Sequence, residues 1–231
     1  MLLRVLISFF LFGIFSSNAQ DKDIDSLKTA FKNAKHDTTR IITLLAIGEK
    51  VYFEDPDSAL NVWFKAKSLA EECLKKTISD NFLRVKYNTF LANSVEAIGY
   101  IYDGQGNFPK ALKYFNEALN IYRKIDFKIG EANVLNNIGF IYSNQGDVQK
   151  ALKYSRESLK VQEELGDTLG IIASLINLAW ILEKQGSIAA ALKHYFRSLK
   201  LEEKIGDKYS MAATLKNIAL IYLTQGDTAK S

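Results

Sequence analysis

Hydrophobic and polar positions follow a helical period over most of the chain. Between residues 134 and 142 the apolar side chains recur at steps of three and four, at Val134, Leu135, Ile138, Ile141 and Tyr142. That spacing places them on one face of an α-helix. After a short polar break at 145–147, a second such face runs from Ala151 to about Gln162. The pattern predicts pairs of amphipathic helices joined by short turns.

These helix pairs repeat every 40 residues. The dipeptide Gln-Gly returns with that period at 105–106, 145–146, 185–186 and 225–226. An isoleucine keeps the same period at Ile101, Ile141, Ile181 and Ile221. Internal repeats of this length indicate a solenoid, in which each unit buries its apolar face against the next.

The turns between helices carry a stop signal followed by a start signal. A glycine suited to the left-handed conformation that ends a helix precedes a residue suited to capping the next helix. The pairs are Gly106-Asn107, Gly146-Asp147, Gly166-Asp167, Gly186-Ser187, Gly206-Asp207 and Gly226-Asp227, and Asp126 stands at one further glycine position. We therefore expect short, similar junctions throughout the repeats.

A divergent unit precedes the regular ones. The pattern predicts a helix from Asp37 to about Tyr52, a second helix from Pro56 to about Lys75, and a short covering helix from Ile24 to about Lys35. The pair Ala59 and Ala66 copies the spacing of Ala111 and Ala118 but lies 52 residues earlier. The linking region is therefore about 12 residues longer than the regular period.

The regular units resemble the tetratricopeptide repeat family. Its pattern of small, aromatic and large apolar residues is met here by Val95, Ile98, Gly99, Tyr102, Ala111, Phe115 and Ala118. The 40-residue period is shared by a longer subclass that includes the kinesin light chain and the bacterial Rap regulators. HEAT repeats also run near 40 residues but lack this signature. The resemblance implies an all-α fold, a right-handed superhelical solenoid of antiparallel helix pairs.

The repeats suggest a division of the chain into three parts. Residues 1–19 read as a signal peptide, residues 20–80 as an N-terminal helix and a divergent first unit, and residues 81–231 as three 40-residue units plus an incomplete fourth. In the first part Arg4 precedes an apolar stretch of about eleven residues, and small residues stand at Ser17 and Ala19. A retained anchor is the alternative, although a spanning helix needs ~20 apolar residues. We expect an exported, periplasmic or extracytoplasmic chain.

Composition excludes several classes of function. The formal net charge of +4 gives no case for a nucleic-acid surface. A single cysteine, Cys73, allows neither an intrachain disulfide nor a cysteine-based zinc site. No catalytic constellation or phosphate-binding glycine loop is present in the sequence. We expect no metal, no cofactor and no enzymatic activity in these residues; a catalytic domain beyond residue 231 would be a separate matter.

The first helix of each repeat carries the candidate binding residues. The resemblance implies that these helices line a groove. It also implies that asparagines on them bind the backbone of an extended peptide or protein segment. An amide side chain suits this role because it both donates and accepts hydrogen bonds. The alternative is that the asparagines bind neighbouring repeats. The candidate residues are Asn133, Asn136, Asn137, Asn177, Asn217 and Lys216, with a mainly aromatic row of Tyr100, Phe140, Trp180 and Leu220.

The chain ends inside its fourth unit, and its last amphipathic helix, about Lys208 to Thr224, lacks a following partner helix. We expect a longer protein, which would contact the membrane only through a segment after residue 231. The uncovered apolar side of the last helix would also allow self-association. The leading hypothesis is the extracytoplasmic input region of a bacterial signalling protein of the histidine kinase or helix-turn-helix type. The alternatives are a freestanding envelope scaffold and the noncatalytic part of an enzyme.

Overall fold

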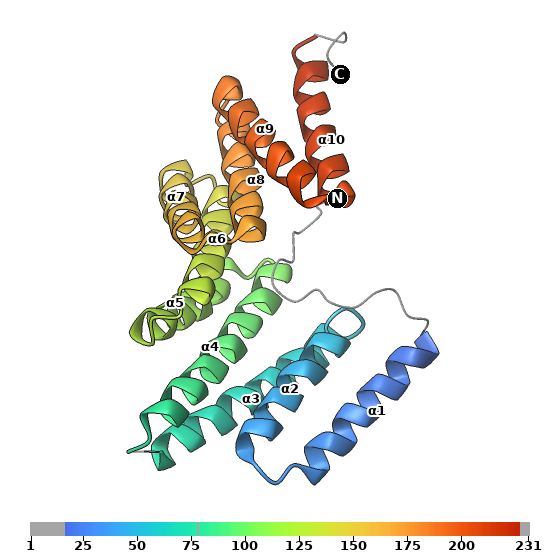
Figure 1. The fold of residues 1–231 in the computed structure, drawn as a ribbon, viewed down its shortest axis with the longest axis vertical. Coiled ribbons are helices and arrows are strands. Elements are labelled where there is room, and N and C mark those ends of the chain that lie inside the picture. Colours follow the sequence, from blue (N-terminus) through green and yellow to red (C-terminus); the bar gives the residue numbers. More distant parts are fainter. Residues whose placement is uncertain (1–16, 78, 227–231) are drawn as a thin grey trace. The chain divides into compact units, whose positions relative to one another are not determined.

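The computed structural model describes residues 17–77 and 79–226, which form ten α-helices and no strand (Figure 1). The helices are α1 (Ser17–Asn33), α2 (Asp37–Val51), α3 (Pro56–Lys76), α4 (Asn81–Gly104), α5 (Phe108–Lys124), α6 (Lys128–Asn144), α7 (Val148–Leu165), α8 (Thr168–Lys184), α9 (Ile188–Ile205) and α10 (Lys208–Thr224). The predicted all-α fold is confirmed. Most of the predicted signal peptide lies outside the described residues.

The helices gather into two compact units whose boundary falls inside α6, between Val134 and Leu135. The N-terminal unit holds α1 to α5 and the start of α6, and the C-terminal unit holds the rest of α6 and α7 to α10. These units reflect packing, whereas the ranges 20–80 and 81–231 reflect the sequence period. That division into ranges therefore stays a prediction.

In the N-terminal unit each helix packs against the next along the chain, from α1 to α5. Ile41, Ile98 and Phe115 are fully buried between them. The predicted divergent unit is the pair α2 and α3, in which the Trp63 ring packs on the bare backbone of Gly48. The Trp63 indole also donates a hydrogen bond to the carbonyl oxygen of Leu45, at 3.3 Å. This pair is thus a helical repeat with its own core.

The long link before the regular repeats is itself helical. Helix α3 has 21 residues, against 17 in α5, and α4 has 24 residues, against 17 in α6. The remaining extra residue lies in the turn between α3 and α4. The insertion of about 12 residues that the sequence predicts therefore extends two neighbouring helices and adds no separate loop.

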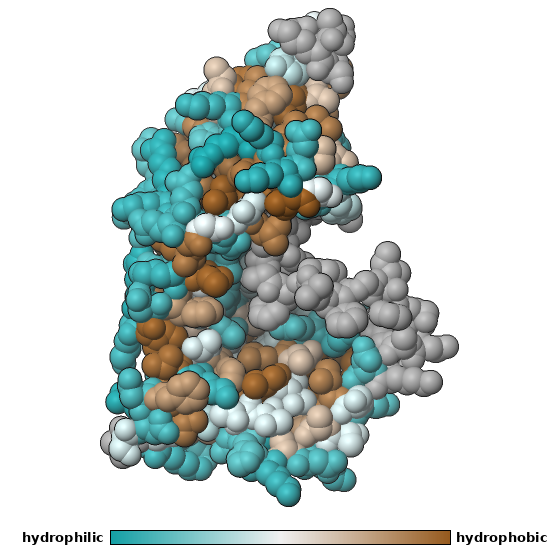
Figure 2. All heavy atoms as spheres, viewed as in Figure 1, coloured by the Kyte–Doolittle hydropathy of each residue, from teal (hydrophilic) through white to brown (hydrophobic). Residues whose placement is uncertain are grey.

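In the C-terminal unit, α7 packs against α8, α8 against α9 and α9 against α10. Leu175, Leu178, Ile181 and Tyr195 are buried at or below 2% exposure. The last helix keeps an uncovered side within the described residues, where Leu215, Leu220 and Leu223 are 46–50% exposed. Hydrophobic side chains reach the surface among hydrophilic ones on the face drawn in Figure 2.

The junctions follow the predicted stop and start signals, with one exception. The six glycines predicted to end helices, from Gly106 to Gly226, all have a positive φ. The predicted helix starts are capped by the side chains of Asn107, Asp147, Asp167 and Asp207, each of which accepts a hydrogen bond from a backbone N–H. Ser187 is the exception, because its side chain makes no capping bond. The predicted cap at Asp227 lies outside the described residues.

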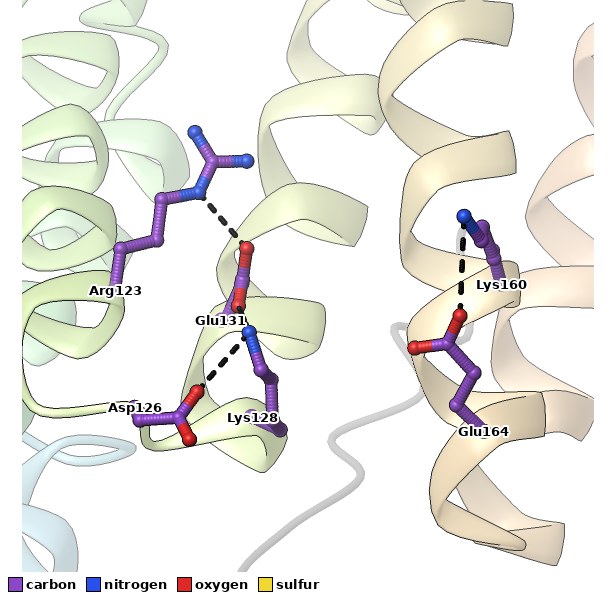
Figure 3. Close-up of polar contacts among 6 residues, drawn as sticks. All are labelled: Arg123, Asp126, Lys128, Glu131, Lys160 and Glu164. Carbon is purple, nitrogen blue, oxygen red and sulfur yellow. Dashed lines mark hydrogen bonds and ion pairs between the residues drawn. The ribbon is translucent and has the colours of Figure 1, made fainter.

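At the junction between α5 and α6, Asp126 adopts the left-handed conformation with φ of 54°. Its carboxylate lies 3.2 Å from Lys128, which in turn lies 3.0 Å from the buried carboxylate of Glu131 (Figure 3). Arg123 reaches the other oxygen of Glu131 at 2.8 Å. Burial raises the pKa of Glu131, but the hydrogen bonds from Arg123 and Lys128 outweigh it and hold that pKa below its usual value. Ion pairs thus bind this turn to both flanking helices.

Candidate peptide-binding face

The candidate residues lie on the first helix of each repeat, and most of them fall in the C-terminal unit. Each repeat has a small residue on its first helix, which is Gly139 on α6, Ala179 on α8 and Ala219 on α10. We define the first-helix face as the side chains three residues before, two residues before and one residue after each of these small residues. It comprises Asn136, Asn137, Phe140, Ile176, Asn177, Trp180, Lys216, Asn217 and Leu220. Lys216 and Leu220 are exposed and the other members are half-buried, so the face is accessible without being fully solvated.

Two of the predicted asparagines contact one another across adjacent repeats. The amide nitrogen of Asn177 on α8 donates a hydrogen bond to the side-chain oxygen of Asn136 on α6, at 2.9 Å. An asparagine side chain has two N–H donors and an oxygen with two lone pairs, so this bond uses only part of the capacity of each amide. The pair can therefore fix its own geometry and still offer a donor and an acceptor to a peptide.

The aromatic row forms a shelf beside this amide pair. The rings of Phe140 and Trp180 stack with their centroids 5.7 Å apart and an interplanar angle of 28°. The ammonium of Lys184 lies 5.5 Å from the centre of the Trp180 ring, a cation–π distance. Because both rings are half-buried, one part of each packs on the protein and another part remains available for contact.

The remaining predicted residues are distributed over other elements. Asn217, Lys216 and Leu220 lie on α10 of the same unit. Tyr100 and Asn133 belong to the N-terminal unit, where Tyr100 packs edge-on against the Phe115 ring at 5.5 Å. The structure therefore brings together the amide pair and the aromatic pair of α6 and α8.

Sequence reasoning missed a polar cluster in the N-terminal unit. The Tyr122 hydroxyl lies 2.7 Å from a carboxylate oxygen of Glu96 and 2.8 Å from the side-chain oxygen of Asn93. Burial raises the pKa of Glu96 to about 7, and the hydrogen bond from Tyr122 opposes the rise. A signal existed, because Glu96 stands 40 residues before Asn136 and so occupies the same position in its repeat.

The described residues were also considered for metal ligands and for membrane-spanning helices. Within those residues no group of three or more His, Cys, Asp or Glu side chains could hold a metal ion. The Cys73 thiol is buried, which raises its pKa, and it lies 3.6 Å from Asp37. No helix among the described residues combines the length and apolar character needed to cross a bilayer.

Comparison with known proteins identifies the repeats. Two family models described as tetratricopeptide repeat match residues 92–125 and 130–204. No protein of curated function matches the sequence.

Solved structures share the fold at low sequence identity. Aspartyl phosphate phosphatase F from Bacillus subtilis is 16% identical with a TM-score of 0.76, and the match covers 92% of this chain and 56% of that one. The Rap conjugation gene regulator of the plasmid pLS20, in complex with the Phr* peptide, is 19% identical with a TM-score of 0.70, covering 89% and 54%. A putative kinesin light chain from Podospora anserina, with nearly identical TPR-like repeats, is 16% identical with a TM-score of 0.60, covering 85% and 92%.

The chain therefore spans just over half the length of the first two proteins and most of the third. At these identities the likeness concerns the fold, a solenoid of helix pairs. Together with the family matches and the 40-residue period, it shows that this chain is a tetratricopeptide-repeat protein.

Proposed function

We propose that the chain is a peptide- or protein-binding scaffold whose binding site is the first-helix face of the C-terminal unit. The observation that carries this proposal is the amide pair Asn136–Asn177 beside the stacked rings of Phe140 and Trp180. Amides pair with the backbone of an extended chain, and half-buried aromatic rings supply contact area for its side chains. The pLS20 regulator, whose structure contains the Phr* peptide, supports such a use of the fold.

We further propose that the chain is exported and serves as the extracytoplasmic input region of a larger bacterial signalling protein. The support is the composition of residues 1–19, with one basic residue, an apolar stretch and small residues near position 19. A module that binds a peptide or protein suits an input role. In this scheme, occupancy of the first-helix face is the signal that the rest of the protein reads.

Peptide selection on the immobilised protein tests the binding proposal. A random decapeptide display pool is selected on the wild type, and the enriched peptides are titrated against the double variant Asn137→Ala plus Asn177→Ala. Each good hydrogen bond to a peptide contributes about 0.5–1.5 kcal/mol, so the loss of two predicts roughly a 5- to 150-fold weaker affinity in the double variant. The readout is the dissociation constant from fluorescence anisotropy.

Two controls separate a binding effect from a folding effect. Asn144→Ala changes an exposed asparagine at the end of α6 and should leave affinity unchanged. Circular dichroism should show equal helix content in all variants, with only a small loss of stability from the lost contacts of the two amides, the Asn177–Asn136 bond among them. Equal affinity of the double variant, or extensive unfolding of it, would contradict the amide role.

A reporter fusion tests export. Alkaline phosphatase that lacks its own signal is active only after export, because its disulfides form in the oxidising periplasm. Fused after residue 231 of the full chain, it should be active, and the same fusion without residues 1–19 should be inactive. Equal activity of the two fusions would mean that these residues do not direct export.

A further inference from the structure

The second helices of the C-terminal unit, α7 and α9, carry exposed basic side chains that the proposed peptide site does not use. Lys153 recurs one repeat later as Lys193, and Lys160 recurs as Lys200. We call this set the basic second-helix face; it comprises Lys153, Arg156 and Lys160 on α7 and Lys193, Arg197 and Lys200 on α9, all of them exposed. The 40-residue period thus gives the two helices matching rows of cations.

The two rows lie close to one another. Arg197 of α9 makes an ion pair with Glu163 of α7. Burial lowers the pKa of the half-buried His194 on α9. Nearby positive charges lower that pKa further, and they belong to Arg197, Lys193 and Arg156. Because Arg156 comes from α7 and the other two from α9, cations of both helices surround one ring, and the face is a continuous array.

Few carboxylates offset the charge of this face. Glu157 is the one acidic residue between Val148 and Lys160 on α7, and α9 has none between Ile188 and Lys200. Two members of the face do pair with carboxylates near the end of α7, as Arg197–Glu163 and Lys160–Glu164 (Figure 3). The members that make no ion pair with any described residue are Lys153, Arg156, Lys193 and Lys200.

The basic second-helix face also surrounds an exposed aromatic ring. Phe196 on α9 is 47% exposed, directly precedes Arg197 and occupies the position that Arg156 has one repeat earlier. The boundary between lipid headgroups and acyl chains accepts aromatic rings, and anionic headgroups attract the Lys and Arg residues around them. Charge alone would suit any acidic partner, so the ring is the observation that favours a lipid surface.

We infer that the basic second-helix face docks the C-terminal unit on an anionic lipid surface, with Phe196 at the headgroup boundary. Clusters of about four to eight Lys and Arg residues bind such surfaces, because each cation is attracted by the negative surface potential. A membrane presents many headgroups at once, so cations spread over two helices each find a partner. The peptide site lies on α6, α8 and α10, and the inference does not rest on it.

Vesicle binding by the full chain tests the inference. The probes are vesicles of phosphatidylcholine alone and vesicles with about 30% phosphatidylglycerol, whose surface is negatively charged. The readout is the partition coefficient from co-sedimentation. In Lys193→Gln plus Lys200→Gln, partition into the anionic vesicles should fall roughly thirty-fold, because each basic residue near such a surface contributes about five-fold. Binding to phosphatidylcholine vesicles, to which the apolar stretch in residues 1–19 can contribute, should be equal in the wild type and the variant.

Matched controls make the vesicle test specific. Lys65→Gln plus Lys75→Gln makes the same change in net charge at exposed positions of α3 and should leave both partition coefficients within about two-fold of the wild type. Phe196→Ala keeps the net charge and should still weaken binding to the anionic vesicles, since it removes the apolar contact. Circular dichroism should show equal helix content in all variants. An equal loss in both lysine variants would overturn the inference, because charge would then act through the molecule as a whole.

Further outcomes decide between a lipid surface and an acidic protein. Equal partition of the wild type into the two kinds of vesicle would overturn the inference. Soluble polyglutamate is the second probe. If it binds the full chain with the same dependence on Lys193 and Lys200, while Phe196→Ala binds the anionic vesicles as the wild type does, the face fits an acidic protein and the lipid surface is overturned. Decapeptides selected on the wild type should bind the Lys193 and Lys200 variant with unchanged affinity, so a failure of the peptide site would be seen separately.

Discussion

At the residue scale, one small residue in each repeat sets how closely its two helices approach. The position is glycine at Gly48, Gly99 and Gly139, and the space beside it is filled by a different neighbour in each repeat. At Gly139 an added Cβ would lie 2.5 Å from the hydroxyl of Ser155 and 3.2 Å from its backbone nitrogen. There the backbone of α7 itself would have to move to make room.

This geometry predicts that Gly139→Leu destabilises the protein. A larger side chain forced into a packed helix contact typically costs ~1–3 kcal/mol, and here the obstruction includes backbone atoms. Urea unfolding followed by circular dichroism measures the change in the free energy of unfolding. Ala212→Leu, at an exposed position of α10, should change it by less than about 0.5 kcal/mol. An unaltered midpoint for Gly139→Leu would show that the repeat register is wrong.

A second residue-scale feature is the shared hydroxyl of Tyr122. Its oxygen lies within 2.8 Å of both Glu96 and Asn93, and one hydroxyl proton can be donated to only one acceptor. A proton on Glu96, or the opposite orientation of the Asn93 amide, would supply the second hydrogen bond. The raised pKa of Glu96 fits the first arrangement.

The raised pKa predicts a stability that falls as pH rises. The Glu96 carboxyl has an ordinary pKa of 4.5 and a pKa of about 7 in the folded chain, so between these values the folded state binds more protons than the unfolded state. Stability from this group is therefore complete below pH 4.5 and is lost as pH rises through 7. The free energy of unfolding, measured from about pH 5 to 8, should fall more steeply for the wild type than for Glu96→Gln. Parallel profiles would refute the assignment, and Glu164→Gln, an exposed substitution on α7, is the control.

At the element scale, the helices were predictable because their signals are local. Period, caps and glycine stops lie within a few residues of each helix end, and the α2, α3 and α10 boundaries fall within one residue of those predicted. Helix α1 was less predictable, since it begins at Ser17 and the predicted covering helix begins at Ile24. Ser187 shows the limit of such signals, because its hydroxyl has rotamers other than the capping one.

The junctions also predict a stabilising substitution, Asp126→Gly. A non-glycine residue in the left-handed conformation costs about 1 kcal/mol, and the corresponding junctions carry glycine. The lost ion pair to Lys128 offsets little, because the Asp126 side chain is 82% exposed and Lys128 retains Glu131. We expect a gain of about 0.5–1 kcal/mol in the free energy of unfolding, measured by urea titration. The reverse change, Gly166→Asp, should lower stability by a similar amount, and a destabilised Asp126→Gly would contradict this view of the junction.

At the scale of the whole molecule, the sequence period predicted which residues share a face but not which of them touch. The period places Asn136 and Asn177 at related positions. Their hydrogen bond, however, joins residues 41 positions apart, so it depends on side-chain rotamers and on how closely α6 and α8 approach. The contact of Tyr122 with Glu96 was missed for the same reason, since it joins α5 to α4 across residues that are 26 positions apart. Local pattern therefore predicted the scaffold well and the polar contacts on it poorly.

The proposed function depends on the paired asparagines and the stacked aromatic rings that α6 and α8 contribute. The chain contains two tryptophans, one in each unit. Trp180 belongs to the first-helix face, whereas Trp63 is buried and its indole N–H is bonded to Leu45. Two indole signals can therefore report separately on the proposed site and on a core distant from it in sequence.

The most direct measurement is a nitrogen–proton correlation spectrum of the full chain during titration with the peptide that binds most tightly. We predict that the Trp180 indole signal and the side-chain amide signals of Asn136 and Asn177 shift in proportion to occupancy, while the Trp63 indole signal stays in place. A peptide that binds without moving the Trp180 and asparagine signals, or that moves the Trp63 signal alone, would show that the first-helix face of the C-terminal unit is not the binding site.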